Sequence, residues 1–164
     1  MMPVCDRNGA IKWMPHDGGR KAAGFRGETG DCVCRAIAIT TDLPYRQVYK
    51  RLADGNATEK KRGFILLEGG KTKPIFQPRS ARNGISVHRA WFKRYMIELG
   101  FEWHGLLKIA QTGRTYLRDL KLPPGSHILK LRAHVIASVD GWLYDNQNPS
   151  RYKNDVVYGY WSLK

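Results

Sequence analysis

Cys32 and His134 are the residues of this chain whose types and spacing could perform nucleophilic chemistry. Cys32 follows Gly30-Asp31 at the start of a short apolar segment, which predicts the first turn of a helix. The positive end of the helix dipole and the unpaired N–H groups there lower the pKa of a thiol and favour the thiolate. A histidine within reach can act as general base and later protonate a leaving group. The pair predicts a thiol hydrolase that works through a covalent acyl intermediate.

A hairpin near the C-terminus predicts what lies beside His134. Asp140-Gly141 is a strong signal for a two-residue loop between antiparallel strands, which we expect over residues 133–139 and 142–146. With that loop Val139 pairs with Trp142, and opposed residues share a face with every second residue along each strand. The register therefore predicts one face that carries four side chains: His134, Ile136, Asp145 and Gln147.

Asp145 is the residue that this register places within reach of His134. Its carboxylate would accept the proton of one imidazole nitrogen and so determine which nitrogen faces Cys32. A slip of one residue in the pairing would turn the strand over, and Asn146 would then take this place. The sequence thus predicts a Cys-His-Asp triad, with Asn146 as the alternative third member.

Helical patterns precede the strands and must position the cysteine. We expect a first helix from Asp31 to about residue 41, with Asp31 as its N-cap. Pro44 fits the first position of a second helix that continues to about residue 53. A third helix is expected over residues 86–99, and Gly100 would end it.

The pattern of the C-terminal part predicts a sheet, whereas that of residues 54–84 predicts mainly loops. We expect strands over residues 126–132, 133–139, 142–146 and 156–161. Helices first and strands later indicate an α+β fold, and 164 residues indicate a single domain over residues 1–164. Residues 1–30 are glycine-rich and expected to be irregular. Residues 54–84 are expected to form a basic, loop-rich excursion with one short element near 64–68.

Several segments resemble a family of short bacterial and phage proteins: Asp17-Gly18-Gly19-Arg20, Gly30-Asp31-Cys32-Val33-Cys34-Arg35-Ala36-Ile37-Ala38, Ala133-His134-Val135-Ile136-Ala137 with Asp140-Gly141, and Val157-Tyr158-Gly159-Tyr160-Trp161. That family is similar to papain-like cysteine peptidases in the order of a cysteine on a helix, a histidine on a strand and an acidic or amide residue on the next strand. The resemblance implies a papain-like fold with N-terminal helices packed on a C-terminal antiparallel sheet. It also implies Cys32 as nucleophile, His134 as base and Asp145 as orienting residue, acting on a peptide or protein substrate.

One position departs from the papain-like pattern. Such enzymes place a glutamine shortly before the cysteine, where it joins the cysteine's backbone N–H in stabilising the oxyanion; here Arg26 stands there. A second donor could come from Arg26, from Thr29 or from a backbone amide of the glycine-rich loop. Asn146 and Gln147, next to Asp145, are further candidates for a supporting role.

The net charge of +14 is the second feature of the sequence that indicates a function. A surface this basic attracts nucleic acid and acidic proteins, and it predicts weak, salt-sensitive binding without sequence preference. Basic residues cluster in the middle of the chain at Lys60-Lys61-Arg62 and Lys71-Thr72-Lys73. The alternative function is therefore an inactive papain-fold binding module that engages nucleic acid or an acidic host protein through this surface.

Other classes of function find little support in the composition. Three cysteines, an odd number without a Cys-x-x-Cys pair, indicate free thiols, and Cys34, about 200° around the helix from Cys32, is expected in the core. The other histidines show no ligand spacing, so no metal or cofactor is expected: His16, His88, His104 and His127. No apolar run is long enough for a membrane helix, and residues 1–12 lack a signal-peptide core. We therefore expect a cytoplasmic protein, in the host cytoplasm if a phage encodes it.

Overall fold

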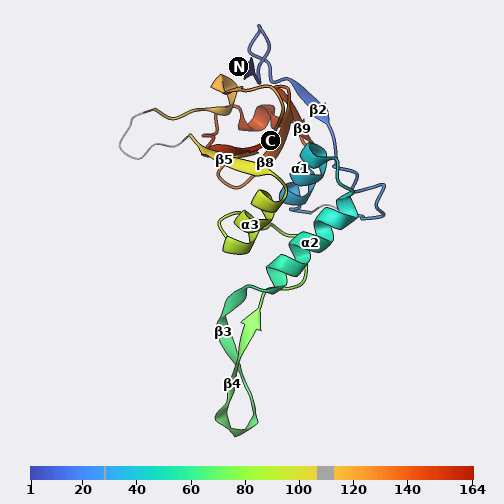
Figure 1. Ribbon diagram of the computed structural model, residues 1–164, viewed down its shortest axis with the longest axis vertical. Helices are drawn as coiled ribbons and strands as arrows, with labels where there is room; N and C mark the ends of the chain where they lie inside the picture. The colour runs from blue at the N-terminus through green and yellow to red at the C-terminus, as the bar shows by residue number, and fades with distance from the viewer. Residues whose placement is uncertain (28, 107–112) are drawn as a thin grey trace.

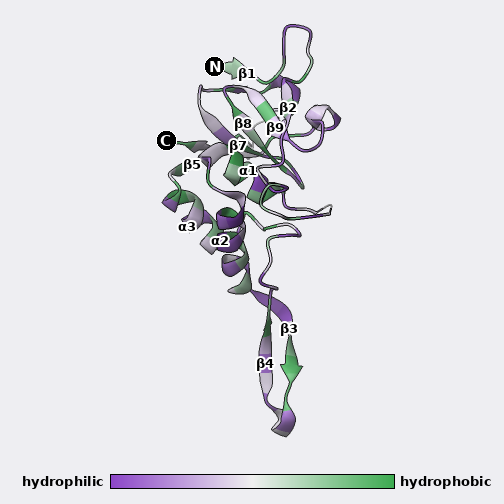
Figure 2. Cartoon of the chain, turned by 90° about the vertical axis from the view of Figure 1, so that its right-hand side faces the viewer, coloured by the Kyte–Doolittle hydropathy of each residue, from purple (hydrophilic) through white to green (hydrophobic). Residues whose placement is uncertain are grey.

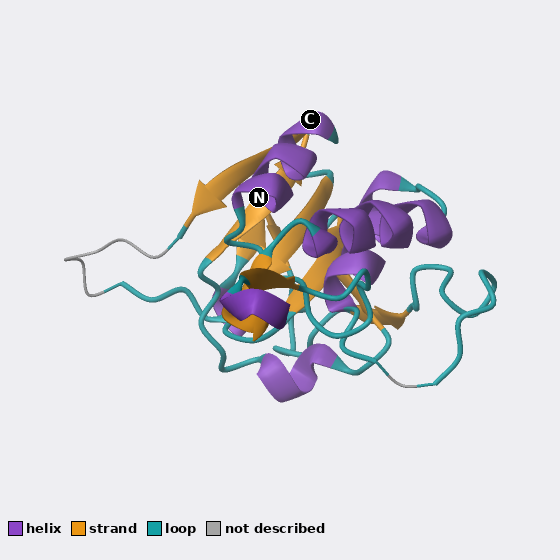
Figure 3. Cartoon of the chain, turned by 90° about the horizontal axis from the view of Figure 1, so that it is seen from below, coloured by secondary structure: helices purple, strands orange, loops and turns teal. Residues whose placement is uncertain are grey.

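Helices gather in the first part of the chain and most strands in the second, as the α+β prediction requires. The computed structural model describes residues 1–27, 29–106 and 113–164. Its helices are α1 (Cys32–Thr41), α2 (Tyr45–Ala57) and α3 (Ala90–Glu98). They lie beside a six-stranded sheet (Figures 1 and 3). The fold is thus mixed α/β.

The sheet is antiparallel except at one edge. Its order is β2 (Trp13–Pro15), β9 (Trp142–Asp145), β8 (Val135–Val139), β7 (Ser126–Lys130), β10 (Gly159–Leu163) and β5 (Phe101–Gly105). Only β2 pairs in parallel, with β9. β5 and β2 were absent from our prediction, and β2 shows that residues 1–30 are not entirely irregular. A three-residue edge strand leaves almost no pattern in a sequence, since its pairing partner lies far along the chain.

The predicted hairpin register is confirmed. Val139 pairs with Trp142, followed by Ser138 with Leu143 and Ala137 with Tyr144. Asp140 and Gly141 both have positive φ, 48° and 76°, as a type I′ turn requires. β8 begins at Val135 rather than at residue 133, so that His134 immediately precedes the strand.

The helix boundaries differ from the expected ones by a few residues. α2 runs to Ala57 although Gly55 interrupts its pattern. Gly55 is required there because a Cβ would lie 2.3 Å from Cε3 of Trp91 on α3. α3 begins at Ala90 instead of residue 86, since residues 86–89 form a turn. Gly100, with φ of 89°, follows the end of α3 as predicted.

Both faces of the sheet are covered by apolar side chains. On one face α1, α2 and α3 bury Ile37, Leu52 and Phe92 against strand residues such as Ile128. On the other face the N-terminal residues and the segment around the short β6 (Lys121–Leu122) form a second cluster; β6 pairs with β1 (Met2–Pro3). No helix in the described part of the chain is long and apolar enough to cross a membrane.

The middle of the chain forms an arm rather than the predicted loop-rich excursion. β3 (Lys60–Leu66) and β4 (Thr72–Phe76) pair as an antiparallel ribbon, with Phe64 opposite Pro74 and Leu66 opposite Thr72. A short 3₁₀ turn (Glu68–Gly70) joins them. The ribbon projects away from the rest of the protein (Figure 1), and every residue of β3 is exposed. Figure 2 shows hydrophilic residues at the base of β3 and hydrophobic ones further out. The pairing was missed because the strands carry no alternation of polar and apolar residues.

Candidate active site

Cys32 and His134 meet where the N-terminus of α1 packs against β8. Cys32 is the first residue of α1, so its backbone N–H has no partner within the helix. His134 directly precedes β8, which packs against α1. Both residues line one cleft of about 620 Å³. The structure therefore brings together two residues separated by about a hundred positions.

The environment of Cys32 favours its thiolate. Burial raises the pKa of the Cys32 thiol, but this effect is outweighed by a hydrogen bond and charge interaction with His134. A backbone hydrogen bond from Val135 and the positive charge of Arg35 act in the same direction, and the net pKa is lowered. A thiolate at a helix N-terminus beside an imidazole is the arrangement that activates cysteine nucleophiles.

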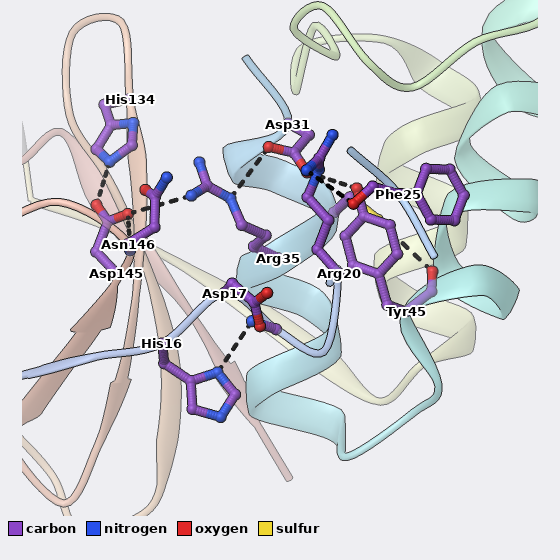
Figure 4. A network of polar contacts seen from close by, with 12 residues as sticks. His16, Asp17, Arg20, Phe25, Asp31, Arg35, Tyr45, His134, Asp145 and Asn146 are labelled. Carbon is purple, nitrogen blue, oxygen red and sulfur yellow. Dashed lines mark hydrogen bonds and ion pairs between the residues drawn. The ribbon is translucent and has the colours of Figure 1, made fainter. Parts of the chain in front are cut away.

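His134 is held by Asp145, as the hairpin register predicts. Nε2 of His134 lies 2.5 Å from Oδ2 of Asp145 (Figure 4), which leaves Nδ1 as the nitrogen that can serve the thiol. Burial lowers the pKa of His134, but hydrogen bonds to Asp145 and Cys32 and their charges raise it to about 9. Tyr152 packs against the imidazole with ring centroids 5.1 Å apart. The ring is thus fixed in position and favoured as imidazolium.

Asp145, not Asn146, is the partner of the imidazole. The one-residue slip that would have exchanged them does not occur. Asn146 instead donates its backbone N–H to Oδ1 of Asp145 at 2.7 Å. Nη1 of Arg35 lies 3.8 Å from the same Oδ1. The buried carboxylate therefore has a donor or a positive charge near each oxygen.

Arg35 connects Asp145 to a second buried carboxylate, that of Asp31. Nε of Arg35 lies 3.1 Å from Oδ1 of Asp31, and Nε of Arg20 lies 3.1 Å from its Oδ2. The hydroxyl of Tyr45 donates to the same Oδ2 at 2.5 Å. Figure 4 shows this network extending from His134 past Arg35 to Tyr45. Asp31 occupies the N-cap position of α1, as predicted, but its side chain makes no capping hydrogen bond because it takes part in this network.

The network gives a structural reason for Gly18 and Arg20 in the Asp17-Gly18-Gly19-Arg20 segment. Gly18 has φ of 68°, and a Cβ there would lie 2.9 Å from Cα of Arg35. The close passage of this loop over α1 carries Arg20 to Asp31. Sequence reasoning missed Arg35, although its spacing of four residues from Asp31 on a helix was a usable signal.

The candidates for oxyanion stabilisation differ in how close the structure places them to Cys32. Thr29 lines the cleft with Cys32, and its buried Oγ1 has no hydrogen-bond partner among the described residues. Asn146 and Gln147 also line the cleft, and Gln147 accepts a hydrogen bond from Arg151 at 2.8 Å. Arg26 is exposed and lines a different hollow, which shares Thr29 with the cleft but is not lined by Cys32. Thr29 is therefore the better placed side chain.

The other cysteines lack the features of Cys32. Cys34 is fully buried, as predicted, and burial raises its pKa to about 12. Burial also raises the pKa of Cys5. Within residues 1–27, 29–106 and 113–164, no group of three His, Cys, Asp or Glu side chains could hold a metal ion.

Comparisons with protein-family models, with curated proteins and with solved structures found no match to this chain. The functional interpretation therefore depends on the site itself.

Proposed function

We propose that this protein is a papain-like cysteine hydrolase that cleaves an amide or isopeptide bond of a peptide or protein. The observations that carry the proposal are a helix-start cysteine that lines one cleft with a histidine, and a buried aspartate whose carboxylate lies 2.5 Å from Nε2 of that histidine. Each of the three groups has the environment that its role requires. The fold, helices beside a largely antiparallel sheet, is compatible with this class.

In the proposed reaction the Cys32 thiolate attacks the carbonyl carbon and forms a tetrahedral oxyanion. Collapse of this intermediate breaks the C–N bond, and the His134 imidazolium gives its proton to the departing amine. Neutral His134 then takes a proton from water, whose oxygen attacks the thioester. The acid is released, and the thiolate–imidazolium pair is restored. Asp145 remains ionised and holds the ring through Nε2.

Two donors are available for the oxyanion. One is the unpaired backbone N–H of Cys32 at the start of α1. The other is the hydroxyl of Thr29, a buried group without a partner among the described residues of the cleft. A buried polar group without a hydrogen bond is costly, and a developing negative charge within the cleft would supply the missing acceptor.

Alkylation by iodoacetamide at about pH 6, where an ordinary thiol is protonated, tests the proposal. We expect Cys32 to be labelled rapidly while Cys34 and Cys5, with raised pKa values, serve as slow references within the same molecule. His134→Ala should suppress labelling of Cys32, and His104→Ala, on β5, should not. Labelling of Cys32 no faster than that of a free exposed thiol would refute the enzyme.

The β3–β4 arm supports a second function, binding of nucleic acid. Residues 60–76 contain five basic residues and one acidic residue, on a ribbon that projects from the protein (Figure 1). A two-stranded ribbon fits the major groove of duplex DNA, and apolar side chains can insert between bases. The arm offers such side chains in its outer part, among them Phe64 and Leu66.

A further inference from the structure

A second hollow adjoins the cleft of Cys32. Its volume is about 810 Å³, and it lies over the β5 edge of the sheet, beside α3. Val87, His88, Lys130 and Arg132 line both spaces, so that the hollow and the cleft are continuous. A molecule bound at Cys32 can therefore extend into the hollow.

Trp103 forms the floor of the hollow, and its indole ring lies across Gly105 and Gly159. Gly105 on β5 and Gly159 on β10 are directly paired, which leaves this part of the sheet without side chains. A Cβ on Gly159 would lie 2.4 Å from Cζ2 of Trp103, so the indole ring rests on the bare backbone. Trp103 packs on Trp161 with ring centroids 4.5 Å apart. Even so, 45% of the surface of Trp103 is exposed.

α3 supplies apolar side chains to the lining of the hollow. Met96 is buried at the base of the hollow, whereas Ile97 is 71% exposed at its mouth. Phe101 closes the space between the helix and the sheet. A hollow lined by an exposed indole and by aliphatic side chains is suited to an aromatic group.

The rim of the hollow is basic. Lys93, Lys130, Arg132 and Lys164 line it together with a single carboxylate, that of Glu102. Glu102 already pairs with Lys164 at 3.2 Å. In the described part of the chain no carboxylate pairs with Lys93 or Arg132, so these charges are available to a ligand. Of the two basic residues shared with the cleft, Lys130 donates hydrogen bonds from its ammonium group to the backbone carbonyl oxygens of Leu131 and Arg132. The side chain of Arg132 is therefore the charge nearest the cleft that favours an anionic group.

We propose that the hollow binds an aromatic side chain with a neighbouring carboxylate, belonging to the substrate whose amide is cleaved at Cys32. This inference rests on the proposed hydrolase and specifies its substrate class. The part of the hollow lined by Trp103 and Ile97 receives the aromatic ring, and the basic rim receives the carboxylate. Lys130 and Arg132, which line both spaces, lie between the ring and the cleaved bond.

Chloroacetamide probes test this directly, because they report on binding through the rate of one reaction at Cys32. The thiolate forms a bond to the methylene carbon as the C–Cl bond breaks, and chloride leaves with the bonding electrons. Three probes are compared: N-chloroacetyl-phenylalanine, N-chloroacetyl-alanine and N-chloroacetyl-phenethylamine, which lacks the carboxylate. Each rate is divided by the rate of the same probe with N-acetylcysteine in solution.

We expect the corrected alkylation rate of Cys32 with the phenylalanine probe to exceed the rate with each of the other two probes by about tenfold. This is the discrimination that an apolar pocket or an ion pair typically provides. Trp103→Ala should remove the advantage over the alanine probe. Trp142→Ala, at a tryptophan of nearly equal exposure (44%) on β9, should keep this advantage. Ile97→Asp should also remove the rate advantage of the phenylalanine probe. Because position 97 is exposed, this variant should fold and can replace Trp103→Ala if that variant does not fold.

The outcomes separate this inference from the proposed function. Fast alkylation of Cys32 by iodoacetamide together with equal corrected rates for the three probes would overturn the inference and leave the hydrolase standing. Slow reaction of Cys32 with every reagent would refute the hydrolase itself. An advantage that persists in both Trp103→Ala and Ile97→Asp would show that the selectivity arises elsewhere and would also overturn the inference.

Discussion

Replacing Asp145 by asparagine should raise the pH needed to ionise Cys32. The substitution keeps the size of the side chain and removes the charge that lies 2.5 Å from Nε2 of His134. Without this charge the pKa of His134 falls, and the imidazolium is lost at lower pH. The thiolate of Cys32 then loses its positive partner, so the pKa of Cys32 must rise.

The size of the effect follows from the pKa of His134, which is raised from 6.5 to about 9. Asp145 and Cys32 share the rise, and half of it corresponds to about one pH unit, or about 2 kcal/mol. A fall of about one unit leaves His134 protonated at about pH 6, so the effect is expected at about pH 8–9, where the variant has lost the imidazolium that the wild type retains. Alkylation of Cys32 should be slower in the variant than in the wild type over this range.

The assay is the rate of iodoacetamide labelling of Cys32 across pH, followed by mass spectrometry of the Cys32 peptide. Asp140→Asn is the matched control: it removes one negative charge from the same hairpin, and the asparagine oxygen can still accept the hydrogen bond from the backbone N–H of Gly125. A profile for folded Asp145→Asn that superimposes on the wild-type profile would refute the linkage between Asp145, His134 and Cys32.

Three further predictions concern stability and charge. Arg35→Met should destabilise the fold by about 3 kcal/mol in urea unfolding, because it leaves two buried carboxylates without their shared partner; Arg35→Lys should recover part of the loss, and an unchanged midpoint would contradict the network. Gly159→Ala should cost about 1–3 kcal/mol in thermal unfolding, since its Cβ would lie 2.5 Å from the carbonyl oxygen of His104; an unchanged melting temperature would contradict the packing of Trp103. Replacing Lys60, Lys61 and Arg62 by glutamine should reduce the slope of log K for duplex DNA against log salt by up to about 3 between about 50 and 200 mM, without unfolding the protein. Sequence-specific binding that survives high salt would contradict a non-specific arm.

The parts of the site that could be predicted are those with local signals. Asp140-Gly141 determines a hairpin register by itself, and that register places Asp145 beside His134. Cys32 was recognisable because the Gly30-Asp31 segment and the apolar run after it mark a helix start. Each of these inferences needed only a few neighbouring residues.

The parts that were missed depend on contacts between distant segments. The ion pairs of Arg20 and Arg35 with Asp31 form only after the loop at Gly18 packs on α1. Asp31 is therefore used for this network and not for capping. The hollow over Trp103 depends on the pairing of β5 with β10, and β5 itself gave no recognisable pattern.

The most direct test of the central claim is to trap the acyl-enzyme. With p-nitrophenyl acetate as acyl donor, we expect a burst of one p-nitrophenolate per chain and an acetyl group on the Cys32 peptide, followed by slow hydrolysis. Cys32→Ala should abolish the burst and His134→Ala should strongly reduce it, whereas Cys34→Ala should retain it. A wild-type protein that shows neither burst nor acetylated Cys32, although iodoacetamide labels Cys32 readily, would contradict the assignment of Cys32 as a catalytic nucleophile.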